Sequence, residues 1–152
     1  MTIGTQGNSS KIDAEQTWGG SASVEYFPAP NLAIGAEPGI VFGLKPTGAP
    51  SSNTQLDMRL RIRVGNLVTN HTFALQGYAT AGVSWVFPMN GDTAQGMIAG
   101  LGIAVTIPLR GTQFVGLDVG YQHGWQGVTV GGVDGDLSTR FLHFGVGLGT
   151  FL

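Results

Sequence analysis

The sequence contains no cysteine, few charged residues and no long hydrophobic run. Without cysteine, the chain can form no disulfide framework and can perform no thiol chemistry. Charged residues make up 11% of the 152 residues, whereas ordinary soluble domains have about a quarter. No run of 18 apolar residues is present, which excludes a transmembrane helix. The formal net charge of −2 provides no basic field, so we expect no nucleic-acid partner.

The segment 56–67, LDMRLRIRVGNL, alternates strictly between apolar and polar side chains. Its even positions are apolar from 56 to 64, and its odd positions carry Asp57, Arg59, Arg61 and Arg63. Successive side chains of a β-strand point to opposite faces. The alternation therefore predicts a strand with one apolar face and one face that carries three arginines.

The same alternation recurs along the chain and predicts seven antiparallel strands with almost no helix. They span residues 11–27, 32–45, 56–67, 73–87, 97–109, 113–125 and 139–152. Polar linkers at 46–55, 88–96 and 127–138 alternate with shorter turns, a layout typical of a barrel that crosses an asymmetric membrane. A tilted strand of about 9 to 11 residues spans a bilayer, and every segment reaches that length. Pro38 within the second segment predicts an edge strand or a bulge.

The distribution of charge indicates which face is enclosed. No charged residue falls mid-strand on an apolar face. A nearly neutral set of charges on the opposite face suits an enclosed lumen, in which acids and bases pair. We predict that Glu25 and Glu37 pair with Arg61 or Arg63. The charged residues on the polar strand faces are Lys11, Asp13, Glu15, Glu25, Glu37, Lys45, Asp57, Arg59, Arg61, Arg63 and Asp118, and the predicted lumen charge network consists of Glu25, Glu37, Arg59, Arg61, Arg63 and Asp118.

The apolar faces carry aromatic residues near the strand ends, as in the aromatic girdles of membrane barrels. The predicted lipid-facing girdle consists of Trp18, Tyr26, Phe42, Trp85, Tyr121 and Trp125. The alternative is a soluble barrel of the lipocalin type, with its apolar face inward and its charges in water. That barrel would have to fit seven long apolar faces into one small interior.

The strand pattern, the phrases VEYFPAPNLAIGAEPG and GLDVGYQHG, and the C-terminal HFGVGLGTFL resemble the small bacterial outer-membrane β-barrels, the OmpA-like transmembrane domain group. The resemblance covers residues 11–152. It implies an antiparallel up-and-down transmembrane β-barrel of about eight strands, located in the bacterial outer membrane and surrounded by membrane lipid. It also implies that Gly147, Phe151 and Leu152 form a C-terminal signal read by the barrel assembly machinery. Thr150 departs from the hydrophobic position of that signal.

Residues 1–10 are treated as a separate N-terminal segment, a remnant of a first strand or a loop. MTIGTQGN is too short and too polar to span a membrane, so only seven of the eight expected strands are clear. The first strand is either poor, missing from this chain, or supplied by another protein chain that completes or covers an edge. The first residues also lack the apolar segment of a secretory signal, so we expect none in this chain.

Candidate catalytic residues are few, and we expect no enzyme, no cofactor and no metal. His123 has the parity of the apolar face, near the outer rim. A nucleophile must lie within hydrogen-bond reach of such a histidine, but no serine or threonine lies within two residues of it. Ser138 and Ser84 are the only plausible nucleophiles. His143 has the parity of the lumen, where we expect it to join the polar network.

Three functions remain open from the sequence. An eight-stranded barrel is just wide enough for its own side chains to fill it. This favours a structural anchor or an interaction module that acts through its outer loops or edge strands. A narrow channel for water, ions or small solutes is the alternative, because glycine-rich inner faces near residues 100–120 leave space. A membrane-embedded lipid hydrolase is the third function.

Overall fold

The computed structural model describes residues 2–5, 8–11, 18–29, 31–44, 53–65, 73–87, 93–130 and 133–150. Within these ranges the chain is almost entirely β-strand, and no helix is found that could cross a membrane. The strands are β1 (Thr2–Thr5), β2 (Asn8–Lys11), β3 (Trp18–Ser21), β4 (Val24–Ala29), β5 (Leu32–Leu44), β6 (Asn53–Gly65), β7 (Ala74–Phe87), β8 (Ala94–Pro108), β9 (Gln113–Val130) and β10 (Val133–Thr150).

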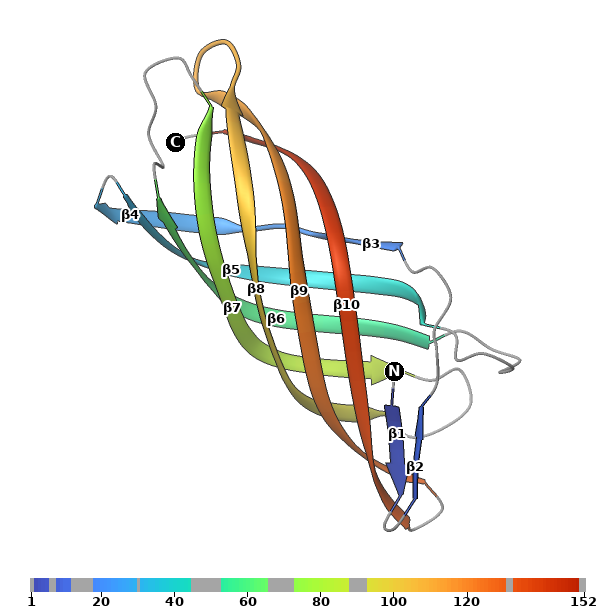
Figure 1. Cartoon of the computed structure of the whole chain (residues 1–152). Coiled ribbons are helices and arrows are strands. Elements are labelled where there is room, and N and C mark those ends of the chain that lie inside the picture. Colours follow the sequence, from blue (N-terminus) through green and yellow to red (C-terminus); the bar gives the residue numbers. More distant parts are fainter. Residues whose placement is uncertain are drawn as a thin grey trace.

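All ten strands belong to one antiparallel sheet, with the order β2-β1-β10-β9-β8-β7-β6-β5-β3 and with β4 also paired to β5. Figure 1 shows the sheet curling on itself, so that β5 and β6 cross behind β8, β9 and β10. Together β3 and β4 occupy the place of the strand predicted at 11–27. The result is a curled half-barrel of seven strands, and the prediction of an all-β antiparallel fold is confirmed.

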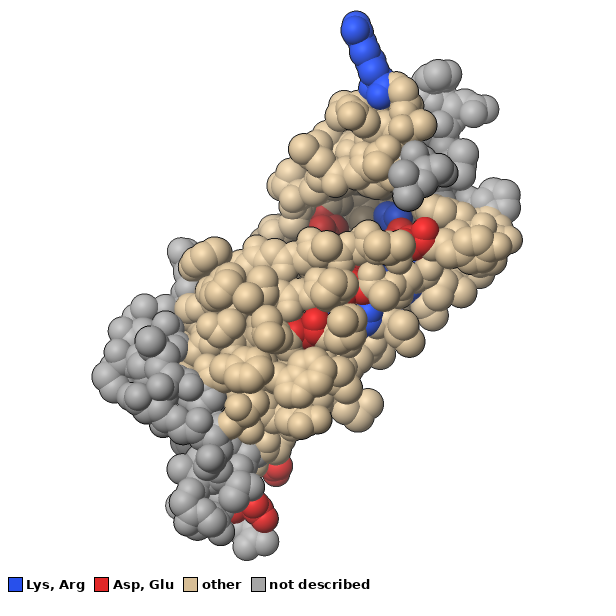
Figure 2. Space-filling view, turned by 180° about the vertical axis from the view of Figure 1, so that it is seen from behind, with Lys and Arg blue, Asp and Glu red and all other residues tan. Residues whose placement is uncertain are grey.

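The two faces of the curled sheet differ sharply in polarity. On the concave face, which we call the inner face, Glu37 and Arg59 are only 4% and 6% exposed. On the convex face, the outer face, Leu60, Leu101 and Val146 are 66%, 67% and 82% exposed. Charged atoms show through openings in an otherwise mostly uncharged wall (Figure 2). The apolar faces therefore point outward as predicted, and the lipocalin-type alternative is wrong.

Pro38 explains a break in the edge strand. It pairs with Met58 of β6 within β5, and its carbonyl oxygen accepts a hydrogen bond from the backbone N–H of Ala22, at 3.1 Å. In an antiparallel strand the N–H and C=O of one residue point to the same side, so the N–H that Pro38 lacks would face the edge strand. The neighbouring chain is interrupted there, between β3 and β4. The prediction of an edge strand or bulge at Pro38 is thus half right. Strand β5 is not itself the edge strand, but its neighbour at the edge is interrupted opposite Pro38.

A bulge near the end of β5 reverses the alternation of its side chains. The register with β6 shifts between Val41 and Leu44, and Gly43 adopts a φ of +76°. Residues other than glycine rarely adopt that backbone conformation. Strict alternation would place Leu44 on the outer face, but the structure buries it with Val86 and Ala94 in a small apolar cluster.

The predicted linker at 127–138 is wrong, because β9 continues to Val130 and β10 begins at Val133. Two glycines between runs that contain valine are a strong hairpin signal, and the sequence VTVGGV carries it. The predicted alternation of long and short connections is also wrong. The connection between β6 and β7, at 66–73, is as long as that between β5 and β6, at 45–52. Connection length therefore does not distinguish the two rims.

The two rims are instead named by their elements. The hairpin rim is the end at which β9 connects to β10, and the C-terminal rim is the end at which β10 finishes. The half-barrel is open between β10 and the β3–β4 edge. Strand β1 pairs with β10 only from Gly135 to Ser138, which leaves 139–149 without a strand neighbour on that side within the described chain.

We predict that the two open edges do not pair with each other. Cysteines introduced at Ser23, between β3 and β4, and at Gly147 on β10 should form no disulfide under mild oxidation, since the bond requires Cα atoms within about 7 Å. Cysteines at Gly116 and Gly147 are the matched control, because these two residues are direct cross-strand partners with open space at both positions. Non-reducing gels report the crosslinks. Crosslinking of Ser23→Cys with Gly147→Cys as fast as the control would contradict the open arrangement.

Candidate functional site

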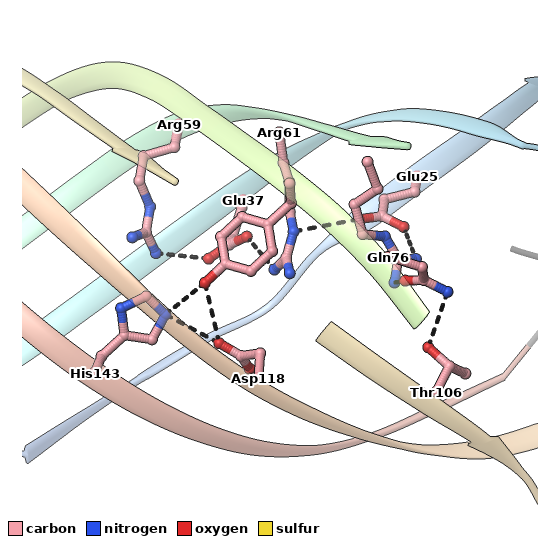
Figure 3. Close-up of polar contacts among 10 residues, drawn as sticks. Glu25, Glu37, Arg59, Arg61, Gln76, Thr106, Asp118 and His143 are labelled. Atoms are coloured by element: carbon pink, nitrogen blue, oxygen red, sulfur yellow. Dashed lines mark hydrogen bonds and ion pairs between the residues drawn. The ribbon is translucent and has the colours of Figure 1, made fainter. Parts of the chain in front are cut away.

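Polar and charged side chains from seven strands meet on the inner face (Figure 3). We call this set the inner network. Its members come from β4, β5, β6, β7, β8, β9 and β10, and all of them point away from the apolar outer wall. The inner network consists of Glu25, Glu37, Arg59, Arg61, Arg63, Gln76, Tyr78, Thr106, Asp118 and His143.

Glu37 lies at the centre of the charged part. It faces Arg59 directly in the register of β5 and β6, and its Oε1 accepts a hydrogen bond of 2.7 Å from Arg59 Nη2. Its other oxygen, Oε2, accepts a hydrogen bond of 2.7 Å from Arg61 Nη1. All three side chains are largely buried. Charge-assisted bonds of this kind are roughly twice as strong as neutral ones, so one carboxylate binds two neighbouring arginines of the same strand.

Glu25, on the next strand β4, reaches the same row of arginines and shares Arg61 with Glu37. Its partner in β5 is Gly35, and a Cβ at that position would overlap the Glu25 side chain. The glycine therefore opens a path across β5, along which Glu25 forms ion pairs with Arg61, at 3.7 Å, and with Arg63. The predicted pairing of Glu25 and Glu37 with the arginines is present in the structure.

Two neutral side chains extend the network to β7 and β8. Arg63 Nη1 donates to Gln76 Oε1 at 2.7 Å, and Gln76 Nε2 donates to Thr106 Oγ1 at 3.3 Å. Gln76 and Thr106 are both buried. Buried polar groups are costly unless they are hydrogen-bonded. Here the bond from Arg63 and the bond to Thr106 each satisfy part of the hydrogen-bonding capacity of Gln76.

Tyr78 spans two strands to reach the far side of the half-barrel. The register places Tyr78 of β7, Gly102 of β8, Gly120 of β9 and His143 of β10 in one row. A Cβ at either glycine would overlap the tyrosine side chain, so the phenol occupies the space that these glycines leave. Its hydroxyl lies 2.9 Å from His143 Nε2. The space predicted along residues 100–120 is therefore filled at this row.

Asp118 and Arg61 complete the connection between the two halves of the network. Asp118 Oδ2 is 2.9 Å from His143 Nε2 and accepts a hydrogen bond of 3.3 Å from the Tyr78 hydroxyl. The Arg61 guanidinium lies over the Tyr78 ring, 4.2 Å from its centroid, in cation–π geometry. A continuous chain of polar contacts thus runs from Glu25 on β4 to His143 on β10. The expectation that His143 joins the polar network is confirmed.

The arrangement binds strands together and offers little for catalysis. Its acids are engaged with arginines, a tyrosine and a histidine, and no nucleophilic serine contacts His143 in the described chain. Within the same part of the chain, no group of three or more His, Cys, Asp or Glu residues could hold a metal ion.

The predicted girdle residues lie on the outer face to different degrees. Four of them are exposed, namely Trp18, Tyr26, Tyr121 and Trp125. The exposed fractions of Trp18 and Tyr26 are 70% and 73%. Phe42 and Trp85 are half-buried, and the Phe42 ring packs at 4.6 Å against that of Trp18. The position of a lipid boundary remains a prediction.

Of the predicted C-terminal signal, Gly147 lies in β10 opposite Gly116. Phe151 and Leu152 lie outside the described residues, and so do Asp13, Glu15 and Lys45. The side chain of Lys11 is likewise not described. The role of the signal remains a prediction.

The predicted lumen charge network left out the neutral members of the inner network. Gln76, Tyr78 and Thr106 share the polar-face parity of their strands, which was the available signal, but carry no charge. A second cluster lies on the outer face, where His123 Nε2 is 2.8 Å from Ser138 Oγ. Ser84, the other nucleophile considered for His123, is buried on the inner face and accepts a hydrogen bond from Gln126.

No family model, no curated protein and no solved structure matched the chain.

Replacing Glu37 by glutamine should clearly destabilise the protein. Loss of one partner of a buried ion pair costs about 3 to 5 kcal/mol, because the remaining charge is left without compensation. Here Arg59 loses its carboxylate partner, and Arg61 keeps only the longer contact with Glu25. The urea midpoint of the refolded protein measures the effect, with the exposed Asp136→Asn as the matched control. Equal midpoints for Glu37→Gln and wild type would show that the arginines are solvated.

Gly120→Ala should also destabilise the protein, because its methyl group would overlap the Tyr78 hydroxyl. Overpacking of this kind typically costs about 1 to 3 kcal/mol. Gly116→Ala, on the same strand with open space around it, is the control and should be nearly neutral. Part of the cost should disappear when Gly120→Ala is combined with Tyr78→Phe. Equal urea midpoints for the two glycine variants would contradict this packing.

Proposed function

We propose that the chain forms the wall of a transmembrane β-barrel in a bacterial outer membrane and acts there as a structural anchor or interaction module. One observation carries the proposal, namely the inverted polarity of the two faces. Ion pairs and amides are enclosed on the inner face, while large apolar side chains cover the outer face. Membrane barrels have this arrangement, with a polar interior and an apolar outer band.

The size of the apolar outer surface supports a lipid environment. On β10 alone, Leu142, Phe144, Val146 and Leu148 are each at least 68% exposed, and they follow one another along a single face. Soluble monomers rarely expose continuous apolar patches larger than a few hundred Å². The comparable residues of β6 and β8 extend this surface around the curl, so lipid is the environment that suits it.

An anchor is favoured over a channel by the contents of the inner face. A channel requires a continuous path for water along the interior. Tyr78 lies across Gly102 and Gly120, where the sequence suggested space, and Arg61 packs over the tyrosine ring. The side chains that would have to leave this path are held by ion pairs and hydrogen bonds.

Completion of the barrel requires one further strand between the open edges. Six antiparallel pairings separate the β3–β4 edge from β10, so the two edges run in the same direction. One strand antiparallel to both would satisfy them, and β1 already runs antiparallel to β10 at the hairpin rim. We propose that a strand following the path of β1 completes the wall. The barrel assembly machinery is the partner implied for that step.

Site-directed spin labels test the membrane position of the outer face. Labels at Leu60, Leu101 and Leu117 in protein refolded into lipid vesicles should be reached by lipid-soluble relaxation agents, because these side chains face outward. Labels at the inner positions Gln76 and Asp118 are the matched controls and should be shielded from those agents. Access of only water-soluble agents to the outer labels would overturn the proposed function.

A further inference from the structure

A serine and a histidine contact each other on the outer face, on the opposite side of the wall from the inner network. His123 Nε2 and Ser138 Oγ are 2.8 Å apart, although 15 residues separate them in sequence. The β9–β10 hairpin brings them together, because His123 faces Arg140 and Trp125 faces Ser138 in its register. His123 and Ser138 are therefore diagonal cross-strand neighbours, a separation that long side chains can bridge.

Two aromatic rings fix the orientation of the imidazole. The Trp125 ring stacks on His123 with centroids 4.1 Å apart and an interplanar angle of 21°. Tyr121 lies on the opposite side of His123 along β9. The centroids of the Tyr121 and His123 rings are 6.5 Å apart, and the rings meet edge-on at 77°. In serine hydrolases a carboxylate usually holds the catalytic imidazole in place. Here the flanking aromatic residues of the same strand face restrict the ring plane while Nε2 contacts Ser138.

We propose that Ser138 and His123 form a nucleophile–base pair that hydrolyses carboxylic esters of long-chain amphiphiles. A serine hydroxyl is a weak nucleophile until an adjacent base accepts its proton, and the 2.8 Å contact provides that base. The pair itself depends only on the geometry of the hairpin. Its substrate class rests on the proposed function, because a lipid-facing wall is where long-chain esters are found.

The reaction consumes one water molecule and no other co-reactant. Ser138 Oγ attacks the ester carbonyl carbon while its proton moves to His123 Nε2. The bond between the carbonyl carbon and the alkoxy oxygen then breaks, and the imidazolium returns the proton to the departing alcohol. Water, deprotonated by the same imidazole, attacks the resulting acyl-serine. A carboxylic acid leaves, and the serine hydroxyl is restored.

The surroundings of the pair suit an ester with a long acyl chain. Arg140 is exposed and faces His123 in the register, where its guanidinium can stabilise the oxyanion that forms on the carbonyl oxygen. Further along β10 toward the C-terminal rim, Leu142, Phe144 and Val146 form an exposed apolar strip. An acyl chain that lies against this strip places its ester beside Ser138.

A fluorophosphonate probe tests the pair directly. The full chain, refolded in detergent micelles, should be labelled, and peptide mass spectrometry should locate the label on Ser138. Ser138→Ala should abolish labelling, and His123→Gln should slow it by about 10²-fold, a typical contribution of a general base. Ser21→Ala removes an exposed serine of β3 and should label at the wild-type rate. The gel migration of unheated samples confirms that each variant is folded.

The outcomes separate this inference from the proposed function. The nucleophile–base pair is overturned if folded wild-type protein carries no label on Ser138. Equal labelling rates for wild type and His123→Gln would also overturn it. Insertion into vesicles without labelling overturns only the pair, whereas labelling without insertion overturns the proposed function and the lipid substrate. A p-nitrophenyl ester of a twelve-carbon acid should be hydrolysed faster than the acetate, in proportion to protein concentration. Equal rates for the two esters would overturn the acyl-chain contact.

Discussion

The enclosure of charge on the concave face is the constraint on which the rest of this structure depends. Burying ionised groups is costly unless each one is paired, and the pairs here join different strands. Glu37 can meet Arg59 only if β5 and β6 lie side by side in the observed register. A slip of one residue would turn the arginines to the apolar face. The ion pairs therefore select the strand order and register. Hydrophobic burial contributes little on this face.

The abundance of glycine follows from the same constraint. Large polar side chains must fit inside a tightly curled sheet, so the strands opposite them need positions without side chains. Gly35 admits Glu25, and Gly39 lies against the guanidinium of Arg59. Gly102 and Gly120 together admit the phenol of Tyr78. Glycine usually weakens a strand, but here its small size allows ion pairs and hydrogen bonds that span several strands.

Much of this fold could be predicted from alternation, because side-chain direction in a strand depends only on parity. Parity correctly assigned Glu37 and Arg61 to the inner face and Leu101 to the outer face. It failed where the backbone breaks the period, as at the bulge that turns Leu44 inward. Parity also could not predict contacts between strands that are not neighbours in the sheet. The meeting of Tyr78 with His143 depends on curvature and on two glycines, neither of which parity describes.

The open edge of β10 links the proposed completion of the barrel to the proposed membrane environment. Its segment 139–149 has no strand neighbour on one side within the described chain, so about half of the backbone groups of that segment face an open edge. In water these groups would be solvated at little cost. In the hydrocarbon core each one costs several kcal/mol, so the edge as a whole would cost on the order of tens of kcal/mol, more than the 5 to 15 kcal/mol by which domains are typically stable. The proposed membrane location therefore requires the proposed completion of the wall, because the half-barrel can be stable in lipid only when another strand covers this edge.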